Sequence, residues 1–153
     1  MKKWIALVLA ALMALPFAGC TGEQKTPKTA DIMSSIRSEI EFTEMAEKTV
    51  DDLPGYGYDL SADDVKQMSY IIATSGLTPE EVFIVEAKDE ATAAKIEEMM
   101  KTRRDQIADL ASTYSPEEMD KINKAVIMTK GSYAYYAVTG DNTKAKKLFE
   151  AAF

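Results

Sequence analysis

The chain contains no histidine and only one cysteine in 153 residues. Histidine is the usual general base of enzymes and the commonest transition-metal ligand. Its absence excludes Ser-His-Asp and Cys-His catalysis, and zinc sites that combine cysteine with histidine. A single cysteine also excludes a disulfide within the chain. Carboxylate, lysine, tyrosine and serine chemistry remains available, but no catalytic motif is present, and we expect no cofactor, no metal and no enzymatic activity.

Basic residues are also few, because 18 lysines and arginines face 25 aspartates and glutamates, which gives a net charge of −7. An acidic surface is repelled by the phosphates of nucleic acids and by anionic lipid headgroups. We therefore expect no nucleic acid partner and no electrostatic contact with a membrane surface.

The N-terminus has the layout of a secretory signal. Met1-Lys2-Lys3 is positively charged, Trp4 to Leu15 is almost entirely apolar, and Pro16 precedes a group of small residues. A retained transmembrane helix is the alternative, but the stretch from Trp4 to Ala18 has 15 residues, whereas a span needs roughly 20. We predict a signal peptide over residues 1–19.

Phe17-Ala18-Gly19-Cys20 resembles a lipoprotein cleavage site, with Phe17 where such signals usually carry leucine. Lipidation of Cys20 would attach a diacylglyceryl group, and two acyl chains hold a protein stably in a bilayer where one does not. We predict a protein anchored in the cell membrane through Cys20 and facing the extracytoplasmic side. Loss of residues 1–19 would leave 134 residues with a formal charge of −9.

The residues after Cys20 divide into a tether and a domain. Thr21 to Thr29 is polar, includes Gly22 and Pro27, and has no apolar periodicity. This composition indicates a flexible tether over residues 20–29. The remainder, residues 30–153, is long enough for one domain with its own core.

Hydrophobic periodicity predicts the elements of this domain. Asp31 is expected to cap a first helix that ends near Ile40, and Ser61 with Asp64 forms a capping box that opens one helical turn through Gln67. Strands are predicted at 70–74, 82–85, 125–129 and 133–139, and further helices at 89–114, 117–122 and 144–153. The order α-ββ-α-ββ-α predicts an α+β fold with a four-stranded, mostly antiparallel sheet and helices packed on one face.

Several short motifs together resemble the domain-of-unknown-function 4358 family of small lipoproteins from Gram-positive bacteria. The resemblance covers roughly residues 30–150, and its features are Glu81-Val82, Arg103 with Gln106, Tyr114-Ser115-Pro116-Glu117 and Gly131-Ser132-Tyr133. It implies a lipid-anchored, extracytoplasmic α+β domain and carries no assigned activity.

Arg103 lies in the middle of the apolar stripe of the long helix, between Met99, Met100, Ile107, Leu110 and Tyr114. A buried guanidinium needs an anionic partner, and Glu81 or Glu86 on the neighbouring strand could supply it. Alternatively, Arg103 lies past the edge of the sheet and extends to water. We hypothesise that Arg103, Gln106 and Tyr133 line an anion-binding or carboxylate-binding cleft at the sheet edge.

Tyrosines are the other candidates for binding. Tyr133 and Tyr135 point to one face of their strand and Tyr136 to the other, while Tyr56 and Tyr58 flank Gly57. Tyrosine can stack on a ligand or anchor a protein partner, although strands favour tyrosine for structural reasons alone. The candidate ligand- or partner-binding residues are Arg103, Gln106, Tyr114, Tyr133 and Tyr135.

Asp59, Ser61 and Asp63 alternate like the first ligands of a calcium loop. Asp64 stands where that loop needs glycine, however, and Tyr70 where it needs glutamate. The capping box of Ser61 explains the segment without a metal.

Taken together, these features favour a non-enzymatic accessory domain at the cell surface that binds a protein or a small molecule. Two alternatives remain: a hydrolase of envelope material that uses carboxylate or tyrosine chemistry, and a structural spacer in an envelope complex.

Overall fold

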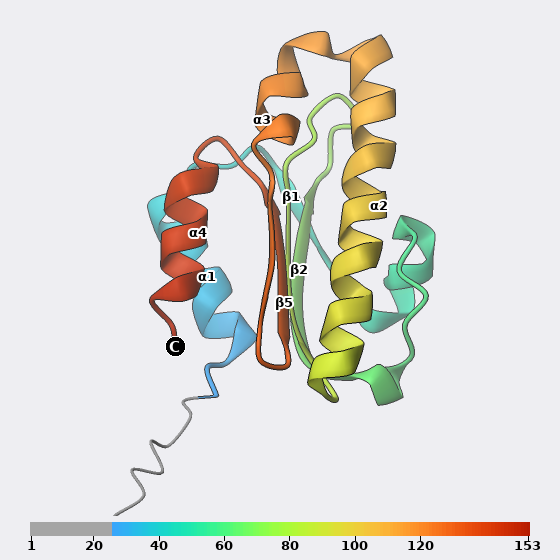
Figure 1. The fold of residues 1–153 in the computed structure, drawn as a ribbon. Helices are drawn as coiled ribbons and strands as arrows, with labels where there is room; N and C mark the ends of the chain where they lie inside the picture. The colour runs from blue at the N-terminus through green and yellow to red at the C-terminus, as the bar shows by residue number, and fades with distance from the viewer. Residues whose placement is uncertain (1–25) are drawn as a thin grey trace, which may run out of the picture.

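The computed structural model describes residues 26–153, which form an antiparallel sheet between helices (Figure 1). The predicted signal peptide, Cys20 and the start of the tether lie outside the described residues. The elements are α1 (Thr29–Glu39), β1 (Met45–Lys48), β2 (Val65–Ala73), β3 (Glu81–Ala87), α2 (Glu90–Tyr114), α3 (Met119–Asn123), β4 (Val126–Lys130), β5 (Tyr133–Val138) and α4 (Asn142–Glu150), with short 3-10 helices at Val50–Tyr56, Ala62–Asp64 and Pro116–Glu118.

The sheet confirms the α+β class but has five strands, not the four predicted. Its order is β1-β2-β3-β5-β4, and every neighbouring pair is antiparallel. The additional strand is β1, which pairs Met45 with Ala73 and Lys48 with Tyr70. It has only four residues and no fully buried position, so its hydrophobic pattern is too short to predict a strand.

Helices cover both faces of the sheet, and the prediction that they pack on one face is wrong. In Figure 1, α2 lies on one side of the strands, and α1 and α4 lie together on the other. Two separate apolar cores result, one under α2 with Phe83 and Tyr136, the other under α1 and α4 with Ile84 and Tyr135. Because alternate residues of β3 and β5 enter different cores, every position of both strands is buried.

Most predicted elements are confirmed with small shifts at their ends. The long helix is capped by Asp89, whose side chain accepts a hydrogen bond from the backbone N–H of Thr92 at 2.7 Å. The capping box of Ser61 and Asp64 is present and opens a single 3-10 turn. Asp31 does not cap α1, because the helix begins two residues earlier, after Lys28. The turn expected to reach Gln67 also ends early, because β2 begins at Val65 to pair with the full length of β3.

The last residues of the predicted tether are held by the sheet. Thr29 is already the first residue of α1 and is buried. The carbonyl oxygen of Pro27 accepts hydrogen bonds from the Tyr133 hydroxyl at 2.8 Å and from Gln67 Nε2 at 3.2 Å. Gln67 and Glu86 bond to each other at 2.7 Å. The chain therefore joins the domain where β2 and β5 begin.

Among the described residues, both cores are built from side chains between Ile32 and Phe153. We therefore expect the polypeptide of residues 26–153 to fold by itself. No helix within residues 26–153 is both long and apolar enough to cross a membrane.

Replacement of Phe149 tests the core beneath α1 and α4. Its ring is fully buried and stacks on Tyr135, with centroids 4.5 Å apart. We expect Phe149→Ala to lower the free energy of unfolding by about 3–5 kcal/mol, because it leaves a cavity. Lys147→Ala, at an exposed position of the same helix, should change it by less than about 0.5 kcal/mol. Urea denaturation measures both, and a similar small loss in the two variants would contradict this packing.

Candidate functional site

Three large apolar side chains are strongly exposed in the described part of the chain, and all three line one pocket. They are Leu77, Leu110 and Tyr114, with exposed fractions of 67 %, 62 % and 72 %. The pocket has a volume of about 310 Å³, which is at the small end of the range for ligand sites. Exposed apolar residues that gather around a hollow are typical of a binding surface.

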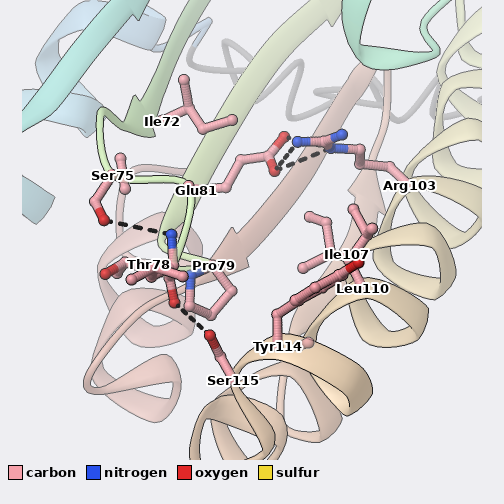
Figure 2. Close-up of a pocket in the computed structure, with 14 residues that line it drawn as sticks. Ile72, Ser75, Thr78, Pro79, Glu81, Arg103, Ile107, Leu110, Tyr114 and Ser115 are labelled. Atoms are coloured by element: carbon pink, nitrogen blue, oxygen red, sulfur yellow. Dashed lines mark hydrogen bonds and ion pairs between the residues drawn. The ribbon is translucent and has the colours of Figure 1, made fainter.

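The pocket lies between the β2–β3 loop and the C-terminal half of α2. Figure 2 shows Ser75, Thr78 and Pro79 on one side and Ile107, Leu110 and Tyr114 on the other. A helix of 25 residues is about 37 Å long at 1.5 Å per residue, whereas the nine residues of β2 span about 30 Å. The apolar stripe of α2 therefore extends past the sheet, which leaves Leu110 and Tyr114 uncovered.

A hydrogen bond joins the two walls at the end of α2. Ser115, the C-cap residue of α2, donates from Oγ to the carbonyl oxygen of Leu77 at 3.1 Å. The N–H of Leu77 donates to Ser75 Oγ at 3.3 Å. Ser115 is itself buried, so this contact fixes the loop relative to the helix and sets the width of the pocket.

Two charged side chains, Glu81 and Arg103, lie at one end of the pocket and form an ion pair (Figure 2). Arg103 Nε donates to Glu81 Oε1 and Oε2 at 3.3 and 3.1 Å, and Nη2 lies 3.1 Å from Oε2. Of the alternatives for Arg103, the structure shows pairing with Glu81. Glu86 cannot replace it, because it lies five positions along β3 and therefore points to the opposite face.

Aromatic rings surround this ion pair. The hydroxyl of Tyr70 donates a hydrogen bond to Glu81 Oε1, and the Tyr56 ring lies beside the guanidinium, with its centroid 5.3 Å from Arg103 Cζ. Tyr58 and Tyr136 are buried in the same core, and their hydroxyls have no hydrogen-bond partner among residues 26–153. In such low-polarity surroundings, the charges of Glu81 and Arg103 are stabilised by their direct partners and not by water.

The surroundings shift the pKa values of both members of the pair. Burial raises the pKa of Glu81, while the charge of Arg103 and the hydrogen bond from Tyr70 oppose the rise. Burial by itself would lower the pKa of Arg103, but the Glu81 carboxylate and the neighbouring tyrosine hydroxyls outweigh it and leave the pKa raised. Arg103 is therefore a permanent cation whose charge is balanced by Glu81.

The structure brings only two of the five candidate binding residues to this pocket, Arg103 and Tyr114. Gln106 is exposed on α2 next to Gly57 and does not line the pocket. Tyr133 and Tyr135 belong to the core under α1 and α4, on the other side of the sheet. The predicted cleft of Arg103, Gln106 and Tyr133 therefore does not form.

Tyr133 instead forms hydrogen bonds that hold the start of the domain. Its hydroxyl lies 3.1 Å from Glu86 Oε2 and also bonds to Pro27. Burial, followed by the hydrogen bond with Glu86, raises the pKa of Tyr133 to about 12. The hydroxyl therefore stays protonated at neutral pH and can hold the start of the domain.

Leu77 lies in a loop, where no periodicity marks it as a binding residue, and the periodicity of the long helix assigns Leu110 to the core stripe. The length of the helix is the signal that could have identified Leu110 as exposed. An apolar stripe that is longer than the strands beneath it must end in exposed residues. No group of three or more acidic residues suited to a metal ion occurs within residues 26–153.

Removal of Arg103 tests the ion pair through pH. Arg103→Met leaves Glu81 buried without a cation, which raises its folded-state pKa further above the unfolded value of about 4.3. The folded state of the variant then favours protonated Glu81, so its stability is greatest below the unfolded pKa and is lost as pH rises through the folded pKa. We expect a deficit relative to wild type of about 3–5 kcal/mol at neutral pH that shrinks towards pH 5.

Urea denaturation at several pH values measures this deficit. The double variant Glu81→Gln, Arg103→Met removes the titrating group, so its free energy of unfolding should lack the fall between pH 5 and pH 7.5 that Arg103→Met shows. A single-variant deficit that stays constant between pH 7.5 and pH 5 would mean that Glu81 does not depend on Arg103.

Comparison with protein families identifies the family of this chain. The family model described as Domain of unknown function (DUF4358) matches residues 38–139, and the chain belongs to this family. The matched region contains β1 to β5 and α2, and therefore every residue that lines the pocket. The curated proteins contain no match to this sequence. The solved structures contain none either.

Proposed function

We propose that this member of the family is a lipid-anchored, extracytoplasmic binding domain that takes a small apolar ligand in the pocket between the β2–β3 loop and α2. The observation that carries the proposal is the position of Leu77, Leu110 and Tyr114, which expose most of their apolar surface around one hollow. Burial of that surface by a ligand would be favourable by about 25 cal/mol per Å².

The position of the pocket suits a domain tethered to a membrane. The chain joins the domain at Pro27, beside Gln67 of β2, whereas the pocket begins at Ile72 and Ala73 of the same strand. Ala73 lies six positions after Gln67 on the strand, a distance of about 20 Å. Figure 1 shows the start of α1 and the β2–β3 loop at opposite ends of the sheet. With an anchor at Cys20, the pocket would open away from the bilayer.

A binding role fits the chemistry of the pocket better than hydrolysis does. Glu81 and Arg103 are the charged residues among those that line it, and they neutralise each other. Glu81 also bonds to Tyr70, but both side chains are buried. A carboxyl group committed in this way cannot reach a substrate as an acid or base without leaving a buried arginine unpaired.

The anchor is tested by fractionation of cells that express the full chain. We expect wild type in the membrane fraction and Cys20→Ala in the soluble fraction, because two acyl chains are lost. Thr21→Ala, which keeps the cysteine, should fractionate like wild type. Equal recovery of Cys20→Ala and wild type in the membrane pellet would show that another feature holds the protein there.

The pocket is tested with the neutral fluorescent dye N-phenylnaphthylamine and the polypeptide of residues 26–153. We expect binding to enhance the dye's fluorescence, and Leu110→Ser to weaken binding about tenfold because an apolar contact is lost. Ala94→Ser, at an exposed position of α2 outside the pocket, should leave binding unchanged. A structural spacer would bind no dye, and equal binding by both variants would place the dye elsewhere.

A further inference from the structure

The guanidinium of Arg103 has hydrogen-bonding capacity that the protein does not use. Its five N–H groups form two edges, and Glu81 occupies the edge made by Nε and Nη2. No residue in the described range 26–153 accepts a hydrogen bond from Nη1. One guanidinium can hold a second planar acceptor through Nη1 and the remaining N–H of Nη2, since carboxylates match that spacing.

The two members of the ion pair differ in their exposure to solvent. The side chain of Glu81 is 1 % exposed, whereas that of Arg103 is 16 % exposed. Both oxygens of Glu81 already accept hydrogen bonds, from Arg103 and from Tyr70. A ligand cation could therefore not reach Glu81, whereas Arg103 lines the pocket and keeps part of its side chain exposed.

The remaining lining of the pocket is uncharged. Figure 2 shows Ile107, Leu110 and Tyr114 following Arg103 along the α2 wall, opposite the β2–β3 loop. A ligand that lies along this wall would place one end at the guanidinium and the rest of its body against apolar side chains. The Tyr56 ring beside Arg103 also favours a cation at this position.

We propose that the ligand is a small apolar carboxylic acid, whose carboxylate binds Arg103 and whose hydrocarbon body packs against Leu77, Leu110 and Tyr114. This proposal rests on the proposed function, since it names the ligand class of the same pocket. The volume of about 310 Å³ suits a single ring or a short chain. Glu81 competes with the ligand for Arg103, so the pair also limits how tightly an acid binds.

Displacement of N-phenylnaphthylamine from residues 26–153 at pH 7.5 tests the ligand class with three probes of one shape: phenylbutanoate, phenylbutanol and phenylbutylamine. We expect the acid to bind at least tenfold more tightly than the alcohol, because it forms charge-assisted hydrogen bonds, and the amine to bind most weakly. Arg103→Gln should abolish the preference for the acid. Arg104→Gln, which removes a neighbouring arginine paired with Asp105, should retain it.

A second variant covers the case in which Arg103→Gln does not fold. Glu81→Gln keeps Arg103 and removes the competing charge, so the ratio of acid affinity to alcohol affinity should rise severalfold, whatever the variant does to the apolar walls that both probes share. Equal affinity for acid and alcohol in wild type, or an unchanged ratio in Glu81→Gln, would overturn the carboxylate proposal while the apolar pocket stands. Failure of wild type to bind the dye or any probe would overturn the pocket as well.

Discussion

The ion pair between Arg103 and Glu81 is the contact on which the arrangement of the pocket depends. It crosses the interface between α2 and the first residue of β3 and has little access to water. A buried pair of this kind fixes how two elements lie against each other, because any slip of the helix would leave a charge without its partner. With α2 held at this point, Leu110 and Tyr114 are carried to positions beside the β2–β3 loop.

Burial of both faces of β3 and β5 gives the domain a rigid centre. Each strand contributes alternate residues to two cores, so neither α2 nor the pair of α1 and α4 can be removed without exposing an apolar sheet face. The pocket is built at the margin of this centre, where the sheet ends and α2 continues. Such a margin can expose apolar surface for a ligand while the strands beneath it remain fixed.

The two ends of the sheet make different contacts. One end holds the entering chain through Gln67, Glu86 and Tyr133, and the other end carries the loop that closes the pocket. Ser115 joins that loop to α2, so the Tyr114-Ser115-Pro116-Glu117 motif has a physical role at the pocket wall. The point where the chain enters the domain and the pocket are thereby separated along the length of β2.

The sequence by itself determined the α+β class, the long helix over roughly residues 89–114, four of the five strands, and the opposite directions of the Tyr135 and Tyr136 side chains, because periodicity and turn residues act locally. Helices on both faces of the sheet were not predicted, because the packing of α1 and α4 on one face and of α2 on the other brings together segments that lie far apart in the chain. Tertiary structure decided the fifth strand, since the four residues of β1 form a strand only by pairing with β2. Tertiary structure also decided which carboxylate pairs with Arg103 and which tyrosines line the pocket. Both depend on strand register and on where the helix extends past the sheet, and these are set by contacts between residues far apart in the sequence.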